Sequence, residues 1–97
     1  MSYTIPHWVD KKARSNAARC SARLDYLLGL LAAHHTDRKS IRGLAEKIGM
    51  DHSTLSLYVR QGKFTDTAAA KMVEGLADAN LTASMLIDPL SIAKSPG

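Results

Sequence analysis

Apolar residues recur at three- and four-residue steps along most of the chain, which is the spacing of one face of an α-helix. The clearest case is residues 41–60. There Leu44 and Ile48 fall on one helical face, Gly49 follows at once, and the apolar spacing resumes at Leu55. The pattern predicts two short helices that pack against each other across a tight turn.

Three residues around this turn suit such a pair. Ala45 is small where the second helix would cross the first, and Gly49 can adopt the positive φ that ends a helix. Asp51 stands where the second helix needs an N-cap, and its carboxylate can accept a hydrogen bond from the backbone N–H of Ser53 or Thr54. We therefore expect defined helix ends on both sides of the turn.

An apolar stripe of alanine, cysteine and leucine precedes this pair of helices, in residues 10–34. Its members are Ala13, Ala17, Cys20, Leu24, Leu27 and Leu31. One long helix and two stacked helices both fit the stripe. We favour two helices, because Ser15 and Asn16 compete for backbone hydrogen bonds and Ser21 is placed to cap the more apolar half.

Two further helices are predicted downstream. Thr65 is placed to begin a helix over residues 67–79, and Thr82 to begin a last short helix that ends at Ile87, two residues before a proline. No segment shows the alternation typical of a β-strand. The predicted fold class is all-α, a compact bundle of about five helices that contains a helix-turn-helix and carries an N-terminal arm or extra helix.

With 97 residues, the chain has the length of one domain with a single core. We divide it into an aromatic and basic N-terminal arm or extra helix (residues 1–20), a helix-turn-helix domain (residues 21–88) and a C-terminal tail (residues 89–97). The arm holds the single tryptophan, Trp8.

The net charge of +4 is unevenly placed. Residues 1–40 carry seven basic and three acidic side chains, residues 41–63 carry four and two, and residues 64–97 carry two and four. A basic first two thirds suits a polyanionic partner, and the acidic last third suits a face turned away from it.

A single cysteine, Cys20, excludes an intramolecular disulfide and favours a reducing compartment. The longest apolar run, residues 26–33, is too short to span a membrane, and residues 1–10 lack the pattern of a signal peptide. We expect a cytoplasmic bacterial protein that associates with the nucleoid by binding DNA and has no membrane partner.

The segment IRGLAEKIGMDHSTLSLYVR, residues 41–60, resembles the helix-turn-helix of the phage lambda repressor and Cro family, which includes YdaS-type regulators of prophages and plasmids. Counted from Ile41, apolar residues stand at the fourth, eighth, tenth, fifteenth and eighteenth positions, alanine at the fifth and glycine at the ninth. The resemblance implies a Cro-type transcriptional repressor that binds operator DNA.

In this family the second helix of the motif enters the major groove of double-stranded DNA. The resemblance therefore implies that base edges are contacted by His52, Ser53, Thr54 and Leu57. Hydroxyl and imidazole groups suit several bases, whereas an exposed leucine suits a thymine methyl group.

Basic and polar residues at both ends of the motif are candidates for phosphate contacts, because cations and helix N-termini attract the DNA backbone. These candidates are Arg38, Lys39, Ser40, Arg60, Gln61 and Lys63.

One module of this size buries too little DNA surface for tight binding alone, so we expect a homodimer on an inverted-repeat operator. The dimer interface is assigned to the last helix and the tail, with the arm of residues 3–9 as the rival surface. The assigned residues are Met85, Leu86, Ile87, Leu90 and Ile92.

Two other functions remain open. One is an activator whose acidic patch of Glu74, Asp78 and Asp88 touches polymerase, and the other is an interaction protein, such as an antitoxin-like partner, that uses the aromatic arm. The chain carries no evident catalytic residues, metal ligands, cofactor site or small-molecule site. Adjacent His34 and His35 point about 100° apart on a helix and so do not form a ligand pair.

Overall fold

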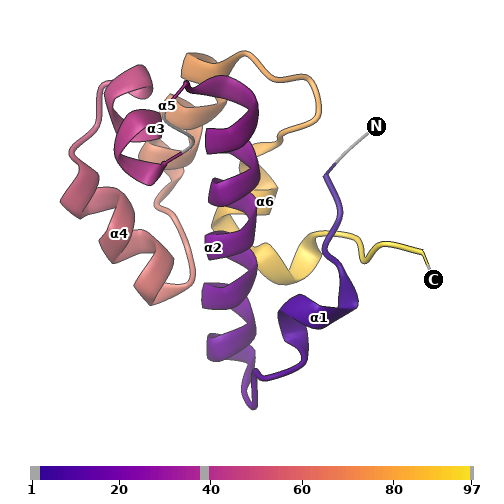
Figure 1. Cartoon of the computed structure of the whole chain (residues 1–97). Coiled ribbons are helices and arrows are strands. Elements are labelled where there is room, and N and C mark those ends of the chain that lie inside the picture. Colours follow the sequence, from indigo (N-terminus) through magenta and orange to yellow (C-terminus); the bar gives the residue numbers. More distant parts are fainter. Residues whose placement is uncertain (1–2, 38–39, 97) are drawn as a thin grey trace.

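Helix α2 (Asn16–His35) is the element against which most of the others pack. The computed structural model describes residues 3–37 and 40–96, and α2 runs through the middle of this part, with α4 on one side and α1 on the other (Figure 1). The remaining elements are α1 (His7–Asp10), α3 (Ile41–Ile48), α4 (His52–Gln61), α5 (Asp66–Leu76), α6 (Ala83–Ile87) and the 3-10 turn η1 (Pro89–Ser91). The all-α prediction is confirmed.

The prediction of two helices within residues 10–34 is wrong, because α2 is continuous from Asn16. Ser15 has extended geometry and its side chain accepts from the N–H of Ala18, so it is the N-cap of α2. Ser21 lies inside the helix, where its hydroxyl donates to the carbonyl of Val59 in α4. The Ser15 side chain does compete for a backbone N–H group, as expected, but it does so at the start of a helix and not at a break between two helices.

The apolar stripe of α2 forms the centre of the core. Leu24, Leu27, Leu28 and Leu31 are fully buried, and helices α3, α4 and α1 pack around them. Burying four leucines stabilises the fold strongly, since each contributes roughly 1.5–3 kcal/mol relative to exposure.

Helices α3 and α4 form the predicted helix-turn-helix. The Ser40 side chain accepts from the N–H of Gly43 at the start of α3, and Gly49 ends α3 with φ 72°. The Asp51 side chain accepts from the N–H of Ser53 at the start of α4. The end signals predicted at Gly49 and Asp51 are therefore confirmed, and Ser40 caps the first helix of the pair.

Helix α5 begins as expected, with the Thr65 side chain accepting from the N–H of Ala68. Its predicted end at residue 79 is wrong, because α5 stops at Leu76 and Ala77 takes a left-handed φ of 50°. Helix α6 follows Thr82, whose side chain makes no capping hydrogen bond. The N–H of Phe64 donates to the carbonyl of Leu86, which ties the segment after α4 to α6.

The two chain ends pair with each other. Ile5 forms an isolated parallel bridge with Lys94, in which the Ile5 N–H donates to Ala93 and the Ser95 N–H donates to the Ile5 carbonyl. Ile5 is fully buried. The expected arm of residues 1–20 therefore contains α1 and the first turn of α2, and the tail of residues 89–97 is packed with it (Figure 1).

A buried arginine joins the arm, α2 and the tail. Arg23 forms two hydrogen bonds to the Asp10 carboxylate, at 3.0 and 2.7 Å, and donates to the carbonyls of Pro89 and Leu90. This bidentate ion pair lowers the pKa of the Asp10 carboxyl, and Lys94 lies 3.4 Å from the same carboxylate. Arg23, one of the seven basic side chains of residues 1–40, is therefore not available to a basic surface.

The expected dimer surface must also be corrected. Met85, Leu86 and Ile92 are buried in the core of the chain itself, so they have almost no surface to offer a partner. Among the five residues assigned to the interface, only Ile87, which is half-buried, and Leu90, which is 39% exposed, reach the surface. The apolar spacing that suggested an interface is the spacing of core residues.

Candidate nucleic-acid interface

Helix α4 has one face in the core and one face in solvent. Leu55 is fully buried, and Tyr58 and Val59 are partly buried against the core. Ser53, Leu57 and Arg60 are exposed, and Leu57 has 42% of its surface accessible. The structure thus brings three of the sequence candidates onto one outward face.

The other two candidates for base contact lie at the edge of this face. His52 and Thr54 are half-buried, as is Ser56. His52 and Thr54 lie in the first turn of α4, near the N-terminal end of the helix. In a helix-turn-helix this end of the second helix contacts base edges in the major groove. The outward face therefore combines hydroxyl groups, an imidazole, a leucine and a guanidinium.

Contacts at the far end of α4 fix its orientation on α2. Gly62 ends α4 with φ 80°, and its N–H and that of Lys63 donate to the carbonyl of Tyr58. The Ser21 hydroxyl of α2 donates to the carbonyl of Val59 at 2.8 Å. The first two bonds close the end of α4 itself, and the Ser21 bond joins α4 to α2, which helps to set the position of its outward face.

The phosphate candidates divide between the two ends of the motif. Arg60, Gln61 and Lys63 are exposed around the end of α4. Ser40 is half-buried and caps α3, while Arg38 and Lys39 lie outside the described residues. The capped first turn of α3 still presents backbone N–H groups without an intrahelical acceptor, which favours an anion there.

Two charged residues near the motif escaped the sequence analysis. Arg42 is exposed in the first turn of α3, where a basic residue beside the Ser40 cap was the available signal. Asp25 of α2 lines a groove of about 560 Å³ together with Arg60 and Ile41. Asp25 could not be placed from the sequence, because only the packing of α2 on α4 brings it close to the motif.

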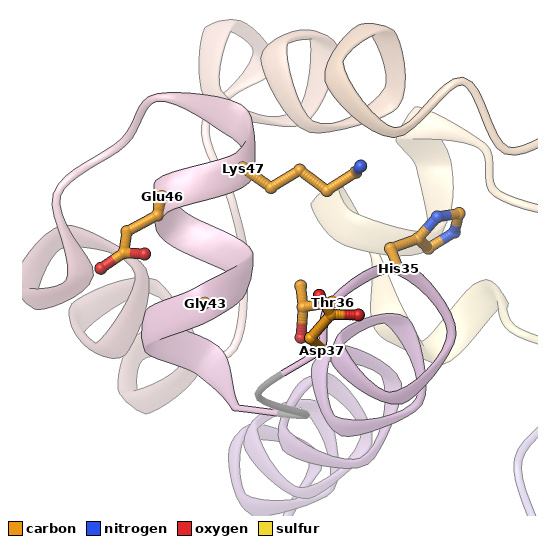
Figure 2. A pocket seen from close by; sticks show the side chains of 6 residues that line it. All are labelled: His35, Thr36, Asp37, Gly43, Glu46 and Lys47. Atoms are coloured by element: carbon orange, nitrogen blue, oxygen red, sulfur yellow. The ribbon is translucent and has the colours of Figure 1, made fainter.

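A second, polar hollow lies between the end of α2 and helix α3. It has a volume of about 370 Å³ and is lined by His35, Thr36, Asp37, Gly43, Glu46 and Lys47. Figure 2 shows the Lys47 side chain extending toward the end of α2, whereas Glu46 points away from it. The hollow therefore offers scattered polar groups rather than a set that converges on one point.

The imidazole of His35 is held by a carboxylate from the loop after α5. His35 Nε2 lies 2.8 Å from Asp78 Oδ2, and the Tyr3 hydroxyl donates to the same oxygen. Burial works to raise the pKa of Asp78, but the hydrogen bonds from Tyr3, His35 and the Asn80 backbone outweigh it and lower this pKa to about 2. Burial and the Asp78 charge raise the pKa of Tyr3 to about 12.

This trio has a structural role, since it joins the N-terminal arm to the end of α2. Within residues 3–37 and 40–96, no group of three His, Cys, Asp or Glu side chains is placed to hold a metal ion. None of the helices in that part combines the length and the apolar character that crossing a bilayer requires.

The aromatic arm anchors the chain through its aliphatic residues. Ile5 and Val9 are buried, whereas Trp8 is 66% exposed. The Trp8 ring meets Tyr26 of α2 edge-on, with centroids 5.4 Å apart and an interplanar angle of 81°. Trp8 thus keeps a large apolar surface in solvent.

Comparison of the chain with protein-family models, with curated proteins and with solved structures found no significant match.

Proposed function

We propose that this protein is a sequence-specific regulator that binds double-stranded DNA through α4, and that it acts as a Cro-type repressor. One observation carries the proposal: α4 buries Leu55 yet exposes Ser53, Leu57 and Arg60 on a single face. A capped, rigidly seated helix with a hydroxyl-bearing outer face has the shape and chemistry to lie in a major groove.

Phosphate contacts supply most of the affinity in this proposal. The start of α3 carries Arg42 beside a capped N-terminus, and the end of α4 carries Arg60 and Lys63. Cations at both ends of the motif suit the two phosphate backbones that border one groove. With about five phosphates contacted per subunit, the slope of log affinity against log salt is about −4 to −5.

A homodimer on an inverted repeat remains part of the proposal, because one module of this size buries roughly 600–1,000 Å² on DNA. Its interface must use residues at the surface. Ile87 and Leu90 are the members of the originally assigned set that meet this condition. Half-sites would then be spaced by about one turn of DNA.

Repression follows from simple occupancy, since a small regulator can block polymerase by covering the operator. The activator alternative is weakened by the position of Asp78. This residue has only 9% of its side chain exposed and is engaged by His35 and Tyr3, so an acidic patch of Glu74, Asp78 and Asp88 loses its middle member. The proposal keeps the cytoplasmic location that the sequence led us to expect.

Selection of bound fragments from random duplex DNA tests the proposal. We expect a recurrent sequence with two-fold symmetry. Leu57→Ala should remove a thymine preference at one position of each half-site, and Ser53→Ala should weaken binding, while Lys71→Ala on α5 serves as a matched surface control. Recovery of no sequence preference at modest ionic strength, by a protein whose helical content is intact, would rule the proposal out.

A further inference from the structure

The largest exposed apolar side chain of the chain lies beside a cluster of cations. Trp8 lines a hollow of about 460 Å³ together with His7, Asp10, Lys11, Arg19 and Lys94. We call this hollow the Trp8 pocket. It draws residues from α1, from the first turn of α2 and from the tail, so the pairing of the two chain ends builds it.

The side chains that line the Trp8 pocket carry a net positive charge, with three cations and one carboxylate. Its one carboxylate, Asp10, is held by two hydrogen bonds from the buried Arg23, and Lys94 approaches it at 3.4 Å. Lys11 and Arg19 add two further cations at the rim. The field in the pocket therefore attracts an anion, while the indole of Trp8 offers an apolar surface next to it.

The Trp8 pocket faces away from the proposed DNA surface. On α2, the residue that binds α4 and the residue that meets the arm are five positions apart, which places them about 140° apart around the helix at about 100° per residue. Ser21 binds α4, whereas Tyr26 meets Trp8. Figure 1 shows α4 and α1 on opposite sides of α2. A protein bound to DNA through α4 would thus leave the pocket open.

We propose that the Trp8 pocket binds an acidic segment of a partner protein, with a carboxylate beside Lys11 and Arg19 and an apolar side chain against the Trp8 indole. Charge complementarity selects an acidic partner, and tryptophan and arginine are among the residue types enriched where protein interfaces concentrate their binding energy. The inference goes beyond DNA binding and does not depend on it.

A nucleic-acid strand fits the pocket less well than a peptide. Proteins that bind single strands stack successive bases on several aromatic side chains along a continuous basic groove. The Trp8 pocket presents one exposed indole, whose Tyr26 neighbour meets it edge-on and is itself half-buried. A shallow, open hollow of about 460 Å³ suits one or two side chains of a peptide.

Peptide binding to the full chain tests the proposal, because Trp8 is the single tryptophan and reports on its own pocket. The probe is a short labelled peptide that alternates Asp and Leu. One control peptide alternates Asp and Ser, and another alternates Lys and Leu. We expect the Asp–Leu peptide alone to shift the Trp8 emission and to gain anisotropy on binding, with an affinity that falls as salt screens the charges.

The variant Lys11→Glu/Arg19→Glu should weaken this binding by at least about tenfold, because it replaces attraction by repulsion. Lys71→Glu, on the exposed face of α5, should leave it unchanged. If circular dichroism shows that the double variant is misfolded, Lys11→Gln/Arg19→Gln takes its place, with a smaller loss expected. Trp8→Ala, followed by anisotropy, should also weaken binding.

Three results would overturn the proposal. The first is an Asp–Leu peptide that does not bind the unmodified chain, or that binds it and the Lys11→Glu/Arg19→Glu variant equally well. The second is a single-stranded oligonucleotide that displaces the peptide and binds more tightly, which would make the pocket a nucleic-acid site. The third is a dimer that Trp8→Ala converts to monomer, which would make a second copy of the chain the occupant. Duplex binding is measured in parallel, so that failure of either proposal is seen separately.

Discussion

Gly62 lies so close to Cys20 that a β-carbon at position 62 would be 2.8 Å from the Cys20 Cβ. The same β-carbon would be 3.3 Å from the backbone nitrogen of Ser21. This close approach seats the end of α4 on α2. The absence of a side chain at position 62 thus serves both the left-handed φ of 80° and the position of the proposed reading helix.

Replacement Gly62→Ala should therefore destabilise the fold by more than the backbone cost alone. A left-handed alanine costs about 1–2 kcal/mol, and the contact with Cys20 adds to it. Gly49→Ala is the matched control, because Gly49 also has a positive φ but has open space where its β-carbon would be. Urea unfolding should show a clearly larger loss for Gly62→Ala, and equal losses would refute the role given to the contact.

Two glycines inside helices should respond differently to replacement by alanine. Gly29 of α2 has nothing near its would-be β-carbon, so Gly29→Ala should stabilise the chain by about 0.5–1 kcal/mol. Gly75 of α5 would meet the Ile48 side chain of α3 at 2.9 Å. Thermal unfolding should show no such gain for Gly75→Ala, and a gain equal to that of Gly29→Ala would mean that α5 shifts freely on α3.

Removal of the Arg23 charge should be among the most damaging changes outside the leucine core. Arg23→Met leaves the Asp10 carboxylate without its main partner and removes the hydrogen bonds to the Pro89 and Leu90 carbonyls, with an expected loss of about 3–5 kcal/mol. The double variant Asp10→Leu/Arg23→Met should recover part of this stability, because it removes the uncompensated charge. Chemical unfolding of the two variants measures the difference, and a double variant no more stable than the single one would contradict this account.

Stability should decline at both ends of the pH range. The pKa of Asp78 is lowered from 3.8 to about 2, so its contribution is present above pH 3.8 and is lost as the pH falls toward 2. The pKa of Tyr3 is raised from 10.0 to about 12, so its contribution is present below pH 10.0 and is lost as the pH rises toward 12. We therefore measure the free energy of unfolding across the pH range. Tyr3→Phe should reduce its decline at alkaline pH, and Asp78→Asn should reduce part of its decline at acid pH.

The loss of stability at acid pH should persist in part in Asp78→Asn, because the Arg23 ion pair also lowers the pKa of Asp10. A variant that combines Asp78→Asn with Asp10→Asn should lose more of the acid dependence than either alone. Unchanged pH profiles in these carboxylate variants would show that neither Asp10 nor Asp78 is responsible for the loss of stability in acid.

Arg60 should contribute one phosphate contact to DNA binding. Arg60→Ala is expected to weaken binding to all duplexes about equally and to reduce the salt slope by about 1. Its exposed position predicts a stability change within about 0.5 kcal/mol. Filter binding over a range of salt concentrations, with Lys71→Ala as the control, measures the slope, and an unchanged slope would remove Arg60 from the phosphate set.

Local signals in the sequence predicted the motif well. Ser40, Gly49 and Asp51 act through the backbone of their immediate neighbours, so their roles as caps and as a helix end could be deduced without knowing the fold. The outward position of Leu57 followed from helical periodicity in the same way. Such features depend on a few consecutive residues.

Features that depend on distant packing could not be predicted in this way. Apolar spacing marks a face as buried but does not say against what, so Met85, Leu86 and Ile92 suggested a dimer surface although they fill the core. The charge of Arg23 suggested exposure, because its partner Asp10 and the carbonyls of Pro89 and Leu90 become neighbours only in the folded chain. For the same reason, the sequence did not predict that Asp25 lies beside the motif or that cations surround Trp8.

The parallel bridge between Ile5 and Lys94 has a mechanical consequence. Tension applied to the two ends of the chain pulls the paired segments past each other along their length, so that the hydrogen bonds at Ile5 are loaded together in shear. The arm and tail should yield first under force, and Arg23 and Tyr26 would then be uncovered while α3 and α4 stay folded on α2. In an optical trap, a small first extension step would precede the rupture of the helical core.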